Sequence, residues 1–78
     1  MQVEVSYSVL QKDAVKLGVY STNGTLVKEL VNAAQAAGSY KAMWDGLDKG
    51  GAKVSMGVYW MVLDRGSQRF TKMVMLVK

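Results

Sequence analysis

Cysteine and histidine are both missing from this sequence of 78 residues. Without cysteine, the chain has no disulfide, no thiol chemistry and no thiolate ligand for a metal. Without histidine, it lacks the commonest general base and the commonest ligand for transition metals. No serine or threonine therefore has a histidine to activate it for nucleophilic attack. These absences favour a binding or structural protein over an enzyme, and we expect no cofactor.

Long apolar runs are also missing, as is an export pattern at the amino terminus. The apolar runs are far shorter than the ~20 residues that a membrane-spanning helix needs. Residues 1–4 lack the basic and apolar regions of a signal peptide. We expect no transmembrane segment and, if the domain is exported, a signal elsewhere on a larger parent chain.

A concentrated basic patch is the third absence. The net charge is +4, from ten lysine and arginine residues against six acidic ones. The lysines stand singly, at Lys12, Lys16, Lys28, Lys41, Lys49, Lys53, Lys72 and Lys78. Surfaces that bind nucleic acid instead combine clustered basic residues with aromatic side chains on which bases stack. We interpret the lysines as solvated residues, and we expect no nucleic acid as a partner.

Half of the residues are hydrophobic, which predicts one folded domain over residues 1–78. In the amino-terminal half, apolar and polar residues alternate with a period of two. This pattern predicts half-buried strands over residues 3–9 and 15–20. Asn23-Gly24 follows, and this dipeptide is the strongest short signal for a hairpin because both residues tolerate positive φ.

Residues 25–38 allow two interpretations. Leucine and alanine recur every four residues, the alanine-rich stretch 33–37 is prone to form a helix, and Gly38 is a suitable helix stop. However, the Asn-Gly turn leads naturally into a paired strand, which would carry a bulge. We predict a strand to about Val31 followed by an irregular alanine-rich connection, with a helix as the alternative.

The stretch from Trp44 to Tyr59 is the part around which we expect the chain to fold. These two aromatic residues flank a turn that is rich in glycine and aspartate. Aromatic anchors bury large apolar areas, and we predict that both pack in the core. Asp45, Gly46 and Asp48 are predicted to shape the turn, because aspartate bonds nearby backbone groups and glycine accepts positive φ.

Other chemistry in this turn has weaker support. A general acid–base pair formed by Asp45 and Asp48 would need a cleft that perturbs the pKa values, and a hairpin turn has none. A calcium loop needs six or more oxygen ligands with spaced acidic positions, which leaves calcium as the weaker alternative to a turn without metal. Gly46, Gly50 and Gly51 lack the lysine, serine and following helix of a phosphate loop.

The last two predicted strands, residues 58–63 and 69–77, are apolar on both faces. Such a strand is central in its sheet, or one of its faces is covered by something else. Exposed apolar surface commonly marks a docking site, and methionine suits an adaptable contact. Either this hairpin meets a partner, or a loop or residues 33–37 cover the second face.

About seven short strands at regular spacing, separated by turns with glycine, predict an all-β fold. The expected architecture is an antiparallel immunoglobulin-like β-sandwich. Without a cysteine pair, packing around Trp44 and Tyr59 must hold its two sheets together.

Several motifs, taken in order, resemble a bacterial family. Val15–Tyr20 and Asn23–Leu30 fit V-x-L-x-I-Y followed by G-x-x-V-x-x-L, and Ala37-Gly38, Trp44-Asp45-Gly46 and Gly57-Val58-Tyr59 follow them. The sequence resembles the immunoglobulin-like domain of the flagellar hook-capping protein. It resembles more closely the C-terminal sorting domains of proteins exported by the type IX secretion system.

The resemblance implies a function without catalysis. A sorting domain would direct a secreted passenger to the surface of a Gram-negative bacterium, and its terminal hairpin would be recognised. The residues expected to bind the partner are Gly57, Tyr59, Trp60, Lys72, Met73, Met75 and Val77. The partners would be secretion or assembly machinery, or a neighbouring domain of the parent chain.

Two alternatives remain beside sorting. One is a structural assembly module like the hook-cap domain. The other is a carbohydrate-binding appendage of a secreted enzyme, in which an outward-facing Trp60 would stack on a sugar.

Overall fold

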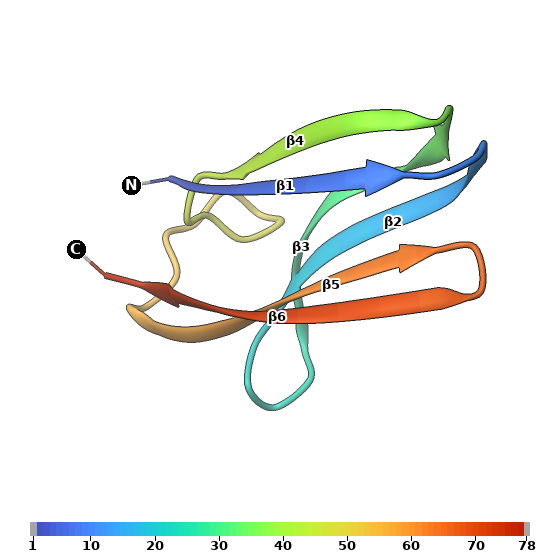
Figure 1. The fold of residues 1–78 in the computed structure, drawn as a ribbon. Coiled ribbons are helices and arrows are strands. Elements are labelled where there is room, and N and C mark those ends of the chain that lie inside the picture. The colour runs from blue at the N-terminus through green and yellow to red at the C-terminus, as the bar shows by residue number, and fades with distance from the viewer. Residues whose placement is uncertain (1, 78) are drawn as a thin grey trace.

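The computed structural model describes residues 2–77. Its strands are β1 (Val3–Val9), β2 (Asp13–Tyr20), β3 (Leu26–Gln35), β4 (Gly38–Trp44), β5 (Gly57–Arg65) and β6 (Gln68–Leu76). They form a two-stranded sheet, β1-β4, and a four-stranded sheet, β3-β2-β5-β6 (Figure 1). All neighbouring strands are antiparallel. The predicted all-β, immunoglobulin-like sandwich is confirmed, with six strands in this range in place of about seven.

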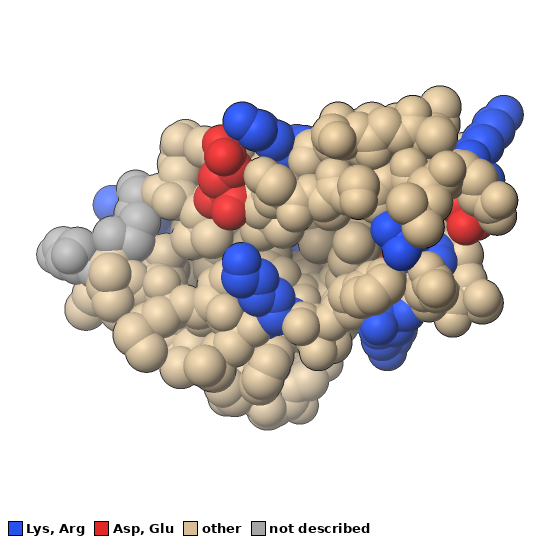
Figure 2. All heavy atoms as spheres, in the orientation of Figure 1, with Lys and Arg blue, Asp and Glu red and all other residues tan. Residues whose placement is uncertain are grey.

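Charged side chains are scattered over the surface. Figure 2 shows the basic side chains as separate spots on the face in view. Within residues 2–77, basic residues form ion pairs with Asp45, Glu4 and Asp64. None of the described residues forms a helix long and apolar enough to cross a membrane.

The predicted hairpin between β2 and β3 is confirmed, but its turn differs in detail. The amide of Ser21 donates to the carbonyl of Thr25 (2.9 Å), and the amide of Gly24 donates to the carbonyl of Ser21 (3.0 Å). Only Gly24 has a positive φ, of 87°, and Asn23 does not. These bonds fit a three-residue loop that ends in a left-handed glycine, rather than a two-residue Asn-Gly turn.

β3 corrects the prediction for residues 33–37. Ala33 pairs with Val15, and Ala34 pairs with Ala14. Both the irregular connection and the helix alternative are therefore wrong for this part of the stretch. Pairing with β2 outweighs the low intrinsic preference of alanine for strands, because β-propensity depends strongly on context.

The predicted bulge in β3 is also present. The pairing register with β2 shifts at two points, beside Gly18 and Tyr20. At these points Leu30 and Val27 are extra residues without a partner in β2, and both pack against the core. Each bulge breaks the period of two, which explains why the sequence pattern of β3 resembled a helix.

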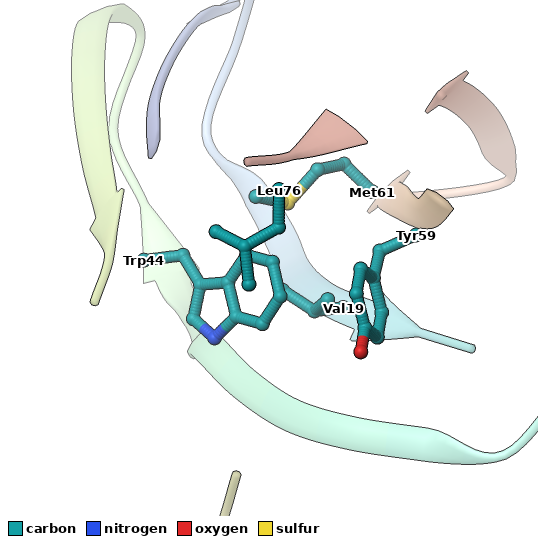
Figure 3. Packing of buried hydrophobic residues seen from close by; sticks show 5 residues of the cluster. All are labelled: Val19, Trp44, Tyr59, Met61 and Leu76. Atoms are coloured by element: carbon teal, nitrogen blue, oxygen red, sulfur yellow. The ribbon is translucent and has the colours of Figure 1, made fainter. Parts of the chain in front are cut away.

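The core lies between the two sheets and contains both predicted anchors. Its central cluster is Val19, Trp44, Tyr59, Met61 and Leu76, which converge from four strands (Figure 3). The Trp44 side chain is fully buried and meets the Tyr59 ring edge to face, with centroids 5.1 Å apart. The Trp44 Nε1 donates to the carbonyl of Leu47 (2.9 Å), and the Tyr59 hydroxyl donates to the carbonyl of Ser55 (2.6 Å). Both aromatic residues therefore bury their rings without losing a hydrogen bond.

Candidate docking surface

β5 is a central strand, which is one of the two alternatives that its apolar faces allowed, and its alternate residues have different surroundings. β6 has the same sequence pattern but is an edge strand with an uncovered face, so within residues 2–77 neither alternative holds for it. Tyr59 and Met61 point into the core. Trp60, between them in the sequence, points to the opposite face of the sheet, where it lies across from Met73 in β6 and Tyr20 in β2. Side chains directly opposite each other on antiparallel strands share a face.

We call the apolar surface formed in this way the outer patch. It consists of Tyr20, Val58, Trp60, Val62, Met73 and Met75. The side chains of Trp60, Met73 and Met75 are 39%, 57% and 63% exposed. Within residues 2–77, no segment covers this face, and residues 33–35 lie in β3, two strands away from β5. The alternative that residues 33–37 cover the hairpin is therefore wrong.

A hollow of about 330 Å³ lies in the outer patch beside Trp60. Tyr20, Val62 and Thr71 line it together with Arg69 and the turn between β2 and β3. Aromatic walls and a polar border suit the insertion of one apolar side chain of a partner.

An ion pair fixes the border of this hollow. Arg69 contacts Asp64 through two bonds, Nε to Oδ1 (2.7 Å) and Nη2 to Oδ2 (3.2 Å). The bond from Arg69 lowers the pKa of Asp64, and the same bond raises the pKa of Arg69. Both groups are therefore charged at neutral pH, and the Arg69 side chain is held across the strand pair.

The structure brings together only some of the residues that the sequence assigned to a partner. Trp60, Met73 and Met75 share the outer patch. Lys72 lies on the opposite face, because it pairs with the buried Met61. Tyr59 is in the core, which leaves it a structural role and removes it from any docking surface in the folded domain.

The other two predicted partner residues lie near the ends of the hairpin. Gly57 is half-buried at the start of β5, and Val77 is 55% exposed just beyond the end of β6. Conversely, Tyr20 lies in the outer patch although it was not among the residues predicted to bind a partner. Its place on the polar face of the alternating run 15–20 is the signal that predicts an outward orientation.

The turn after β4 uses its carboxylates to bond the backbone. Asp45 Oδ1 accepts from the Leu47 amide (3.1 Å) and from Lys28 Nζ (3.4 Å). The bond from the Leu47 amide is the main cause of a lowered pKa for Asp45. Asp48 Oδ1 accepts from the amides of Gly50 and Ala52, both at 2.9 Å.

The carboxylates of this turn do not gather into a larger acidic cluster. Among residues 2–77, no three acidic, cysteine or histidine side chains lie close enough together to hold a metal ion. Because Oδ1 of Asp45 and Oδ1 of Asp48 accept from backbone amides, both residues stabilise the turn.

Comparisons with known proteins agree with the fold. The sequence profile of the FlgD Ig-like domain family matches residues 2–68. FlgD from P. aeruginosa superposes with a TM-score of 0.73 and 28% identity, covering 97% of this chain and 61% of that one. FlgD from Xanthomonas campestris, described in connection with the hook capping essential for flagellar assembly, has a TM-score of 0.71 and 24% identity over 95% of this chain and 54% of that one. No curated protein matches this chain.

The matches bear on the two main functional expectations. They support the hook-cap alternative, and they give no support for the type IX sorting function. This chain spans only 61% and 54% of the two matched FlgD chains, so the activity of a whole FlgD protein does not follow from them. The profile match covers most of the sequence, and the chain belongs to the FlgD Ig-like domain family.

Proposed function

We propose that this domain is a non-catalytic structural module of a flagellar hook-capping protein, and that it binds neighbouring proteins of the cap through the outer patch. The observation that carries the proposal is the exposed apolar surface around Trp60, Met73 and Met75, in a domain of this family. These three side chains lie outside the core of the sandwich. Their apolar character is therefore better explained by contact with a partner than by folding.

The chemistry of the outer patch fits a protein partner. Tryptophan near the centre of an interface, flanked by side chains that exclude water, is typical of residues that dominate binding energy. Methionine adapts its shape to the surface that it meets. The ion pair between Arg69 and Asp64 supplies a polar border, as interfaces commonly have.

The proposal also gives the domain a place in the cell. Residues 1–78 act as one unit that is exported with its parent protein and works at the cell surface. The neighbours that it contacts are assembly proteins or another domain of the same parent.

A domain exchange tests the proposed function. Residues 2–77 replace the matching segment of FlgD in a P. aeruginosa strain that lacks its own FlgD, and hook formation and swimming are measured. We expect the exchanged protein to restore hooks, and Trp60→Ala together with Met75→Ser to abolish them. Met56→Ser is the matched control, because Met56 is also 63% exposed but lies outside the patch.

Two results would contradict this proposal. Failure of the exchanged protein to form hooks, although it is folded and secreted, would refute the role in the cap. Equal hook formation by the patch variant and the control would show that the domain does not bind its neighbours through the outer patch.

The hollow beside Trp60 also favours a second candidate, carbohydrate binding. Two aromatic side chains, Tyr20 and Trp60, line it with polar groups nearby. Saturable binding of a glycan to the isolated domain, lost in Trp60→Ala, would support this candidate. Absence of binding across a glycan array would leave the structural module as the better account.

A further inference from the structure

The two sheets have unequal sizes, and within residues 2–77 each strand of the smaller one, β1 and β4, has one edge without a neighbouring strand. An immunoglobulin-type sandwich of roughly seven strands sets three against four. Here the arrangement is two against four, and β1 pairs with no segment of residues 2–77 except β4. One edge of β1 therefore lacks a neighbouring strand, and unpaired strand edges are sites where another chain can add.

The core is thinly covered along this edge. Ala42 and Trp44 of β4 point inward and are 9% and 0% exposed. Val3 and Val5 of β1 also pack against the core but are only half-buried, and so is Val74 of β6. The half-buried residues thus belong to β1 and β6, which are edge strands of the two sheets (Figure 1).

β6 shows the same lack of cover from the other sheet. Its residues from Gln68 to Met73 are all exposed, on both faces of the strand. Phe70 and Lys72 lie on the face of the core, because they pair with Leu63 and Met61. We call Val3, Val5, Phe70, Lys72 and Val74 the open side.

Arg65 already occupies one end of the open side. This residue of β5 reaches the other sheet, where its Nη1 donates to the backbone carbonyl of Ser8 in β1 (2.6 Å). Its guanidinium also lies over the Phe70 ring, 4.9 Å from the centroid. The Ser8 carbonyl of β1 thus bonds a residue of the other sheet. The stretch of β1 from Val3 to Tyr7 remains for an added strand.

We propose that this stretch of β1 accepts a seventh strand from a partner protein. The incoming segment is extended, has apolar residues at alternate positions, and carries an acidic residue among them. Its backbone bonds β1, and its apolar side chains cover Val5 and Val74, as in other cases of strand addition. This surface is separate from the outer patch, so the inference does not depend on what the patch binds.

Charge decides the chemistry of the partner. Lys72 lies on the core side of the exposed edge strand and, among the described residues, forms no ion pair. A carboxylate on the incoming strand would balance it. A second copy of this chain would instead bring another Lys72 and another net charge of +4, and like charges disfavour such pairing.

The test uses a capped synthetic peptide in which threonine alternates with valine and glutamate replaces the central valine. Amide hydrogen exchange of the domain is measured with and without it. We expect the amides of β1 that point away from β4 to exchange at least ~10-fold more slowly with saturating peptide. A peptide with lysine in place of glutamate should bind more weakly, and one with N-methylated backbone should not bind.

Matched variants test the role of charge. Lys72→Glu should reverse the preference, so that the lysine peptide binds better. Lys49→Glu makes the same change in the turn beside β3, where the Lys49 amide bonds Val27, and should leave the preference unchanged. Thermal unfolding of both variants verifies that they are folded.

Four results would overturn the proposal. The first is slow exchange, in the free domain, of the β1 amides that point away from β4, which would mean that the edge is not open. The second is protection by the peptide confined to Gln68–Leu76, and the third is a dimer that protects β1 without peptide. The fourth is an unchanged preference in Lys72→Glu.

Discussion

The two faces of the β5–β6 hairpin have similar composition and different surroundings. Tyr59 and Met61 are 7% and 2% exposed, whereas Trp60 between them is 39% exposed. The same strands thus present apolar side chains to the core and to solvent. An apolar residue is buried only where a second layer of structure lies against its face, and here only one face has such a layer.

The inner face of this hairpin therefore serves folding, and the outer face is the one proposed to bind a partner. Substitutions of the buried residues of the inner face should lower stability, and substitutions on the outer face should lower binding while the fold remains. The predictions below probe this separation, starting with the largest expected effect.

Trp44→Ala, which removes the β4 side chain that packs on Tyr59 of the inner face, should cause the largest loss of stability. The indole is fully buried, packs on Tyr59 and donates to Leu47. Truncation of a buried aromatic residue costs about 3–5 kcal/mol, which is close to the whole stability of a small domain. Urea unfolding measures the loss, and Trp44→Phe should lose less because a ring remains. A loss in Trp44→Ala below about 1 kcal/mol would contradict the assigned role of the core.

Trp60→Ala should cost about 1 kcal/mol of stability or less, because cross-strand contacts on an open face are weak. The same urea titration measures this, and one cooperative transition is expected if residues 1–78 form a single unit. A loss as large as that of Trp44→Ala would mean that the outer face contributes to the fold, and the comparison of the two faces would fail.

Acid should produce the smallest effect, through Asp45 and Asp64. Hydrogen bonds from Leu47 and Arg69 lower the pKa of these two carboxyl groups in the folded state. A lowered folded pKa gives stability that is present above the unfolded value and is lost as the pH falls through the folded value. We therefore expect a lower melting temperature below about pH 4. Asp45→Asn and Asp64→Asn should each flatten this dependence, and an unchanged slope in both variants would contradict the assignment.

Much of the fold could be predicted from the sequence because one period dominates it. Alternation located β1 and β2, and the doubly apolar pattern allowed β5 to be central but did not distinguish it from the edge strand β6. β3 was harder, since the extra residues Leu30 and Val27 interrupt the alternation, and alanine gives no strand signal of its own. Its pairing with β2 is a long-range property that local composition does not contain.

The candidate surfaces were predicted only in part. The sequence assigned Trp60, Met73, Met75 and Lys72 to one contact surface. It did not indicate that Lys72 lies on the other face, because this depends on the register with β5. The free edge of β1 could not be predicted either. A strand pattern reveals which residues alternate, and it does not reveal how many neighbours the strand has.

Methionine oxidation in the assembled cap tests the central claim most directly. The exchanged FlgD protein is exposed to dilute peroxide, free and within assembled hook caps, and sulfoxide formation is followed at each methionine by mass spectrometry. In the free protein, Met73 and Met75 should oxidise quickly and the buried Met61 slowly. In the cap, Met73 and Met75 should become slow while the exposed Met56 stays quick. Equal oxidation of Met73 and Met75 in both states would contradict the proposal that the outer patch is an interface.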